Sequence, residues 1–385
     1  MDFDFETPVD RHGTASVKWT RYGPDILPMW VADMDFPAPP VAVEAMRARL
    51  DHPVFGYTMP TDGLRAAIVE AVARDFDWAI RPEAIVFLAG VVPGFNMAAR
   101  ALARPGEGLL LQTPVYHPML AVPGLAGLEL VEAPLEGPAW GVDADRFAAA
   151  ARRARLFLLC NPHNPCGRVF TRAELEAMAE ACLATDTWIV SDEIHADLVL
   201  DGRRHVPIAS LSPEVAARTI TLMSGGKTYN LAGLGLGWAI IPDAGLRARF
   251  EAARLGMVAG GSMLAMDATE AALRQGAPWR AAMLRRLEAN RDWLAQAVAT
   301  RLPGVTMAKL EATYLAWLDF RGVPMGGELP GAWLRTHARV ALNEGLDFGE
   351  PGRGFARLNF GCPPALLEEG FERIAAAING RAPTG

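Results

Sequence analysis

The sequence predicts an α/β protein, with a large domain built on a mostly parallel sheet covered by helices and a smaller α+β domain. Short runs of Val, Ile and Leu without polar alternation recur along the chain, which is typical of strands buried on both faces. Helical segments lie between many of these runs, and that alternation indicates a parallel sheet. The 385 residues are enough for two domains with a large core.

The first half of the chain gives the elements in order. Residues 1–40 hold six prolines and few periodic stretches, so we expect an extended arm that packs on another part of the molecule. Amphipathic helices are expected over 41–50 and 63–76. Thr171 followed by Glu174 forms a capping box, which marks the start of a later helix. Strands are expected over 84–89, 108–112, 128–132, 155–160, 187–191, 219–223 and 238–241.

The second half changes character after the last of these strands. Residues 244–300 are rich in Ala, Arg and Leu and are expected to be helical. Strand-like runs at 314–320 and 355–360 then precede a final helix near 364–379. We therefore expect three parts: an N-terminal arm at 1–44 that packs with the small domain, a large domain at 45–285 and a small C-terminal domain at 286–385.

Composition excludes several classes of protein. Hydrophobic residues make up 51% and charged residues 21%, as in ordinary soluble proteins, and the net charge of −7 without a basic stripe argues against a nucleic-acid partner. The four cysteines have neither the spacing of a metal site nor the density of a disulfide scaffold. The N-terminus does not read as a signal peptide, and no apolar run reaches membrane-spanning length. We expect a cytoplasmic protein without a metal or a membrane partner.

Three polar residues in the middle of the chain suggest a cofactor. Asn164, Asp192 and Lys227 follow one another at intervals of 28 and 35 residues. Pyridoxal phosphate (PLP) requires a lysine for a Schiff base and an anion beside its pyridine nitrogen. Asp192 ends an apolar run, and ligands of open α/β sheets bind at the carboxyl ends of strands. The alternatives are that Asp192 caps a helix and that Lys227 is a surface lysine.

Other residues near these motifs supply the remaining contacts. Gly90, Val91 and Val92 lie between an expected strand and an expected helix, where backbone N–H groups bind phosphate, and the Ser224 hydroxyl adds a donor. The Asn164 amide is expected to donate to the phenolate oxygen of PLP. His195, three residues after Asp192, is within reach of the same oxygen, although a lone histidine is often structural.

Two further side chains are candidates for contacts with the ring and the substrate. Tyr116 is placed to stack on the pyridine ring, and the alternative is a core tyrosine. Arg357 is a charge inside the apolar run 355–360, and a buried arginine needs an anion. That anion is a substrate carboxylate or, alternatively, the partner in an internal salt bridge.

These motifs resemble those of fold-type I PLP enzymes of the aminotransferase class I/II superfamily, and within it the MalY/PatB-type cystathionine β-lyases, or C–S lyases. A string at 29–36 (Met-Trp-Val-Ala-Asp-Met-Asp-Phe) and the aspartate–histidine block at 191–195 are similar to the lyase subgroup. The matching strings cover nearly the whole chain in order: 27–36, 54–57, 90–93, 112–116, 161–168, 191–195, 227–233 and 357–363.

The resemblance implies a role for each candidate. Lys227 would carry the cofactor, Asp192 would pair with its ring nitrogen, and Asn164 would contact its phenolate oxygen. Tyr116 would stack on the ring and Arg357 would hold the substrate carboxylate.

The resemblance also implies a homodimer, in which Tyr57 reaches the phosphate site of the neighbouring subunit. From the string at 27–36 we expect Asp33 to contact substrate. The chain departs from the family where Gly226 replaces a frequent serine and where Gly235 replaces a phosphate-binding arginine of many aminotransferases. Phosphate binding would then depend more on backbone N–H groups, Ser224 and the partner's tyrosine.

The activity that we expect is β-elimination. A cysteine S-conjugate such as cystathionine would lose its Cα proton to Lys227 and a thiolate from Cβ, giving pyruvate, ammonia and a thiol. An aminotransferase of class I/II would use the same residues and is the alternative. A non-catalytic PLP-binding regulator fits less well, since regulators of this fold usually carry an N-terminal DNA-binding domain and the arm is too short for one.

Overall fold

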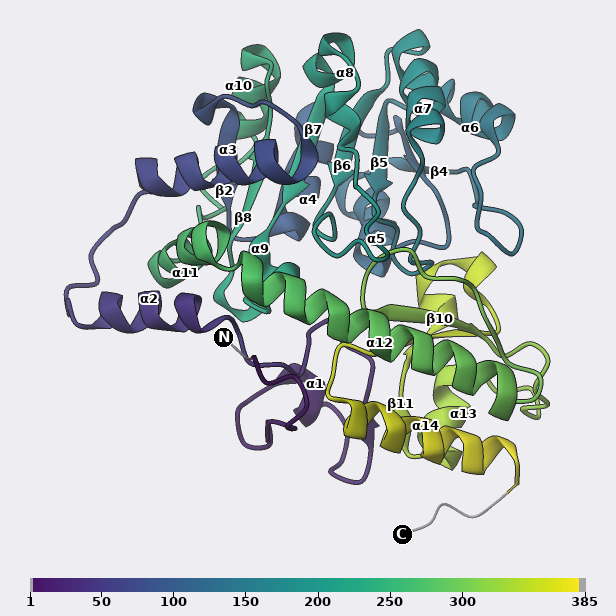
Figure 1. Cartoon of the computed structure of the whole chain (residues 1–385). Helices are drawn as coiled ribbons and strands as arrows, with labels where there is room; N and C mark the ends of the chain where they lie inside the picture. The colour runs from purple at the N-terminus through teal and green to yellow at the C-terminus, as the bar shows by residue number, and fades with distance from the viewer. Residues whose placement is uncertain (1–2, 381–385) are drawn as a thin grey trace.

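The computed structural model describes residues 3–380 and is centred on a seven-stranded sheet (Figure 1). The strands are ordered β2-β8-β7-β6-β5-β3-β4. Strand β8 is antiparallel to its neighbours β2 and β7, whereas the other neighbours are parallel. The prediction of a mostly parallel sheet is therefore confirmed. The bounds are β2 Ile85–Leu88, β3 Gly108–Leu111, β4 Glu129–Glu132, β5 Leu156–Cys160, β6 Trp188–Asp192, β7 Thr219–Met223 and β8 Gly237–Ile240.

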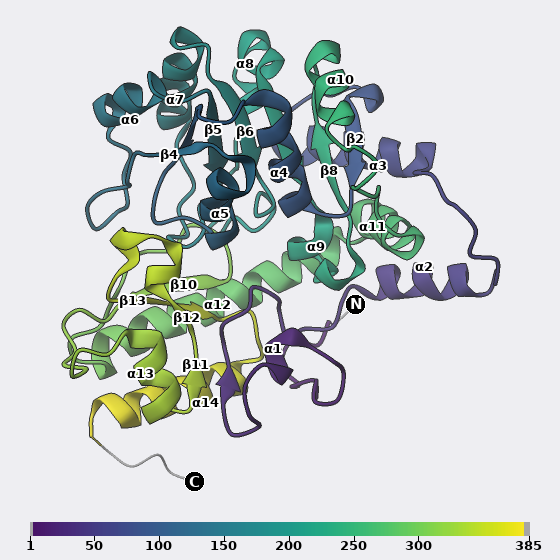
Figure 2. The same ribbon diagram turned by 180° about the vertical axis from the view of Figure 1, so that it is seen from behind.

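Helices cover both faces of this sheet, because its central strands are buried along their whole length. One face packs against α4 (Val91–Leu102), α5 (His117–Ala126) and α10 (Ala244–Ala252). Figure 2 shows α4 and α5 in front of the sheet. The other face packs against α6 (Ala144–Ala151), α7 (Arg172–Ala184) and α8 (Pro213–Ala217).

The start of α7 confirms the predicted capping box. Thr171 Oγ1 accepts a hydrogen bond from the Glu174 N–H at 3.2 Å, and Glu174 Oε2 accepts one from the Thr171 N–H at 2.8 Å. Each side chain satisfies a backbone donor that the first helical turn leaves free.

A smaller antiparallel sheet forms the second layer of the molecule, in the order β12-β13-β10-β9. The N-terminal arm lies beside it, since β1 (Leu27–Pro28) pairs in parallel with β11 (Val340–Ala341). Arm residues Met29 and Phe36 share a hydrophobic core with Leu358 of the small sheet. The strands are β9 Thr306–Met307, β10 Leu315–Asp319, β12 Asn343–Glu344 and β13 Phe355–Asn359.

The remaining helices link the two sheets and the arm. The longest, α12, crosses the molecule below the large sheet in Figure 1 and reaches the small sheet. The bounds are α1 Val17–Thr20, α2 Pro40–Leu50, α3 Asp62–Phe76, α9 Gly225–Thr228, α11 Met263–Gln275, α12 Ala277–Arg301, α13 Pro330–His337 and α14 Pro364–Ile378. Short 3₁₀ helices lie at Pro82–Ala84, Ile208–Ser210, Ala232–Leu234, Gly345–Phe348 and Glu350–Gly352.

Side-chain clusters that could bind a metal and helices that could span a membrane are both absent from residues 3–380. Within 3–380, no three His, Cys, Asp or Glu side chains come together as a metal site. No helix in that range is both long and apolar enough to span a membrane. The four cysteines are free thiols, and all of them are buried.

Candidate active site

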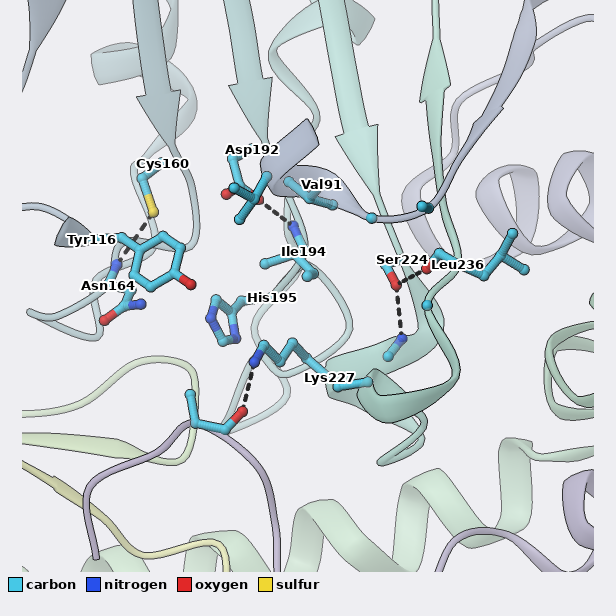
Figure 3. Close-up of a pocket in the computed structure, with 17 residues that line it drawn as sticks. Val91, Tyr116, Cys160, Asn164, Asp192, Ile194, His195, Ser224, Lys227 and Leu236 are labelled. Carbon is cyan, nitrogen blue, oxygen red and sulfur yellow. Dashed lines mark hydrogen bonds between the residues drawn. The ribbon is translucent and has the colours of Figure 1, made fainter. Parts of the chain in front are cut away.

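The carboxyl ends of β5, β6 and β7 meet at one edge of the large sheet, where a cavity of about 160 Å³ opens (Figure 3). Cys160 ends β5, Asp192 ends β6 and Ser224 follows β7. The first turn of α4 and the short helix α9 complete the walls. Most of the predicted site residues line this one cavity: Gly90, Val91, Val92, Tyr116, Asn164, Asp192, His195, Ser224 and Lys227.

Lys227 extends from α9 to the opposite wall of the cavity. Its Nζ donates a hydrogen bond to the Ala32 carbonyl oxygen at 2.6 Å. Burial and the positive charge of Arg357 lower the pKa of Lys227 to about 8, while Asp33 and Asp192 oppose that shift. A far larger fraction of this amine is neutral near pH 7 than of an exposed lysine, so it can act as a nucleophile and a base. The surface-lysine alternative therefore fails.

Asp192 is a buried carboxylate with little hydrogen bonding. Its Oδ1 accepts one hydrogen bond, from the Ile194 N–H at 3.1 Å. Burial raises the pKa of Asp192 to about 7, although the Ile194 N–H and Lys227 favour the ionised form. The chain after Asp192 forms a turn and not a helix, so the helix-cap alternative fails. A buried carboxylate that lines a cavity favours a cationic N–H donor, and the protonated pyridine nitrogen of PLP is such a donor.

Arg357 and Asn164 are joined at the side of the cavity nearest the small sheet. Arg357 Nη1 donates to Asn164 Oδ1 at 2.8 Å, and Nη2 donates to Asn343 Oδ1 at 2.6 Å and to the Trp30 carbonyl at 3.2 Å. Among residues 3–380 no carboxylate pairs with Arg357, and its buried Nε has no acceptor. The internal salt bridge is thus ruled out within that range.

This arrangement fits a substrate carboxylate. Burial lowers the pKa of Arg357 to about 10, so the side chain stays cationic at neutral pH. Its guanidinium lies over the ring of Phe348, 4.8 Å from the centroid. The Oδ1 of Asn164 is already occupied by Arg357, which leaves the Nδ2 amide free to donate to an oxygen in the cavity.

His195 and Tyr116 line the same cavity. Burial, and then the charges of Lys227 and Arg357, lower the pKa of His195 to about 3, so its imidazole is neutral. The His195 Nδ1 has no partner within the described chain. Burial raises the pKa of Tyr116, so its hydroxyl stays protonated. Figure 3 shows the Tyr116 ring between Asn164 and Asp192, where it can cover one face of a planar ligand.

The end of the cavity at α4 is suited to an anion. Helix α4 begins at Val91, and no side chain caps the N–H groups of its first turn. These groups and the helix dipole favour a phosphate there. The Ser224 hydroxyl donates to the Leu236 carbonyl at 2.6 Å and accepts from the Gly226 N–H at 3.0 Å. Its single proton is therefore directed at Leu236, and donation to a phosphate requires the hydroxyl to turn.

The local structure explains why glycine stands at positions 226 and 235, where the chain departs from the family that it resembles. A Cβ atom at Gly226 would lie 3.1 Å from Ser224 Oγ and 3.2 Å from Ala232 Cα, which is tight. Gly235 has φ +71°, a left-handed conformation that glycine adopts without strain. The tight contacts at 226 and the left-handed backbone at 235 therefore disfavour the serine and the arginine that the sequence resemblance leads us to expect there.

Three predicted residues do not line the cavity, and of these only Arg357 hydrogen-bonds to a lining residue, Asn164. The Asp33 carboxylate pairs with Arg11 at 3.0 Å, in the N-terminal arm, and contributes only its charge to the site. Tyr57 lies in an exposed segment between α2 and α3.

Sequence reasoning missed three participants: the Ala32 carbonyl, the Cys160 side chain and Asn343. Ala32 lies in the family string at 27–36, but a backbone oxygen leaves no mark on residue type. Cys160 could have been found as the last residue of an apolar run next to the Asn164 loop. For Asn343 the sequence holds no signal, because its partner Arg357 becomes its neighbour only when β12 pairs with β13.

Comparison with known proteins adds four findings. The family model for class I and II aminotransferases matches residues 24–374. Cystathionine beta-lyase PatB of Bacillus subtilis (strain 168) is 39% identical over 387 residues, covering 98% of this chain and 100% of PatB. A PLP-bound putative aminotransferase from Clostridium difficile 630 has a TM-score of 0.95 at 35% identity, covering 98% and 100%. The PLP-bound C–S lyase from Staphylococcus hominis has a TM-score of 0.91 at 28% identity, covering 98% of each chain.

Proposed function

Because the chain belongs to the family of class I and II aminotransferases, we propose that it is a PLP-dependent carbon–sulfur β-lyase. It cleaves cystathionine or a related cysteine S-conjugate to pyruvate, ammonia and a thiol. One observation carries the proposal: an amine, a buried carboxylate and a free amide line one cavity in a chain 39% identical to a cystathionine β-lyase over its full length.

The cavity residues contact different parts of the cofactor. PLP, when bound, supplies an electron-withdrawing ring that stabilises negative charge at the substrate Cα. Asp192 keeps the ring nitrogen protonated, and the Asn164 amide donates to the phenolate oxygen, with His195 beside it. Tyr116 stacks on the ring. The Gly90–Val91–Val92 turn binds the phosphate through backbone N–H groups, and Ser224 adds a donor after its hydroxyl turns.

Two basic side chains act on the substrate, Arg357 as a cation and Lys227 as a neutral amine. Arg357 binds its carboxylate and thereby fixes the direction of the Cα–H bond. Lys227 takes the Cα proton, which its pKa of about 8 allows near neutral pH. The thiolate then leaves from Cβ.

The test is an assay with purified protein and cystathionine. The expected result is equal release of pyruvate and homocysteine, and loss of both in Lys227→Ala. Lys309→Ala is the matched control, since Lys309 is exposed and does not line the cavity. PLP binding with neither pyruvate release nor amino transfer would instead indicate a regulator.

An aminotransferase is the second candidate, because it would use the same residues and the similar Clostridium difficile structure bears that name. Transfer of the amino group to a keto acid, without pyruvate release from cystathionine, would favour it over the lyase. The ratio of β-elimination to amino transfer depends on where the leaving group lies relative to the cofactor ring.

We also propose that the protein is a homodimer with shared sites. Tyr57 is fully exposed, and Val54, Phe55 and Met59 beside it are exposed apolar residues. In Figure 1 this segment, between α2 and α3, runs along the outer edge of the molecule. Exposed apolar clusters of this kind mark interfaces. The dimer would bring Tyr57 to the neighbour's phosphate site, and a monomer in light scattering with full PLP affinity would contradict it.

A further inference from the structure

One backbone oxygen at the active site receives two side-chain donors. The Ala32 carbonyl accepts from Lys227 Nζ at 2.6 Å and from Tyr314 Oη at 3.0 Å. Tyr314 precedes β10 in the small sheet and is 1% exposed, so its hydroxyl has no access to bulk water. Burial raises the pKa of Tyr314 far above its usual range, and the phenol remains a proton donor at every working pH.

The segment around Ala32 is held in place without Tyr314. Asn359 Nδ2 donates to the Val31 carbonyl at 2.5 Å and to the Asp33 carbonyl at 2.6 Å, on either side of Ala32. Asn230 Nδ2 holds the next residues through the Met34 and Phe36 carbonyls. The Tyr314 hydroxyl therefore adds little to the position of the Ala32 oxygen. Its effect is on how strongly that oxygen binds a second donor.

The backbone before Tyr314 is strained. Thr313 has φ +71°, a left-handed conformation that is a genuine outlier for a β-branched residue. Strain of this kind persists where the surrounding structure requires it, often at functional sites. Here hydrogen bonds from the Thr313 N–H to the Leu198 carbonyl and from the Phe360 N–H to the Tyr314 carbonyl fix the segment.

Several groups face the Lys227 amine and set its charge. Arg357 from β13 disfavours the protonated amine, and Asp33 from the arm and Asp192 from β6 favour it. His195 faces it as a neutral imidazole, and Tyr116 as a neutral phenol. The Ala32 oxygen also favours the protonated amine, because an ammonium is the stronger donor. A carbonyl oxygen shared with a phenol binds that ammonium less strongly than one it does not share.

We propose that Tyr314 acts on Lys227 indirectly and keeps its amine available as a base, by occupying part of the hydrogen-bonding capacity of the Ala32 carbonyl. The role of Lys227 as a base rests on the proposed lyase or aminotransferase function. The hydrogen-bond competition itself does not, and it can be measured in the full-length protein before PLP is added.

The chain is well suited to that measurement, because it has only three lysines: Lys18, Lys227 and Lys309. Protein labelled with ¹³C at lysine Cε gives three side-chain signals, and Lys227→Ala identifies the one of interest. The test compares the pH titration of that signal in the wild type and in Tyr314→Phe. The expected result is a rise in the proton affinity of Lys227 of up to about tenfold, since the gain cannot exceed one hydrogen bond of ordinary strength.

Two controls separate this effect from general damage. Lys18, which is buried against Asp35 at 2.6 Å, is an internal reference for the arm. Tyr229→Phe removes a hydroxyl that is equally buried and two residues from Lys227, and it should leave the titration unchanged. If Tyr314→Phe does not fold, Tyr314→Met removes the same hydroxyl with a more adaptable side chain.

An unchanged or lowered proton affinity of Lys227 would overturn the inference. So would equal shifts of Lys18 and Lys227, which would mean that Tyr314 only supports the arm. In the PLP-loaded enzyme, the acid limb of kcat, which reports groups in the enzyme–substrate complex, should move to higher pH by the corresponding amount. If the lyase assay fails but the titration shifts, the proposed function is wrong and the role of Tyr314 stands.

Discussion

Replacing Arg357 by lysine tests the substrate site most directly. Three of its N–H groups are used by Asn164, Asn343 and Trp30, which leaves one Nη1–H and the buried Nε–H without an acceptor. Arg357→Lys keeps the charge but loses the planar guanidinium and its fixed donor directions. Loss of one charge-assisted hydrogen bond costs about 1.5–3 kcal/mol, which is about 10- to 150-fold in kcat/KM.

The assay compares two substrates that differ only in the group that Arg357 is proposed to bind. Turnover of cystathionine, or of another active cysteine S-conjugate, should fall by the factor above in Arg357→Lys. Turnover of the same compound with its α-carboxylate converted to an amide should hardly change. Arg321→Lys, a change at an exposed arginine outside the cavity, is the control. An equal fall for the acid and the amide would refute carboxylate recognition by Arg357.

Four further predictions concern the cofactor site and the fold. Asp192→Asn keeps the shape but removes the charge beside the ring nitrogen, so the Kd for PLP should rise about 10-fold or more in an absorbance titration. Because the pKa of Lys227 is lowered to about 8, its amine loses its proton near pH 8; PLP recombination with the cofactor-free protein should therefore accelerate from pH 7 to 9 and then level off. A midpoint near 10 would contradict this. Gly235→Ala places a side chain at φ +71° and should cost about 1–2 kcal/mol in unfolding free energy, seen as a lower Tm. Thr171→Ala removes one half of a capping box and should cost about 1 kcal/mol in chemical denaturation, whereas a change at the exposed neighbour Arg172 should not.

Much of the site was predictable because parallel strands end at a common edge. Asp192 ends a strand, Asn164 and Lys227 each follow one, and β5, β6 and β7 are direct neighbours in the sheet. Their order along the chain was therefore enough to bring an amide, a carboxylate and an amine together. The roles of these residues remain proposals, but their convergence in one cavity follows from the fold.

The predictions were weaker where side chains had a choice of partner. Asp33 was expected at the substrate, yet its carboxylate pairs with Arg11 of the same arm. Ser224 was expected to donate to phosphate, yet its proton is directed to the Leu236 carbonyl. Both outcomes depend on which groups lie within hydrogen-bond distance after folding, and residue type alone does not fix that.

The sequence by itself determined the helices, the strands and the α/β fold class. A strand buried on both faces is a continuous apolar run, and the start of α7 is a capping box, so both are visible in local residue patterns. Tertiary structure alone decided the contacts between distant segments. The Ala32 carbonyl meets Lys227, 195 residues away, and Tyr314, 282 residues away. The physical reason is that every residue carries the same backbone oxygen, so only the folded path of the chain selects the one that faces the amine.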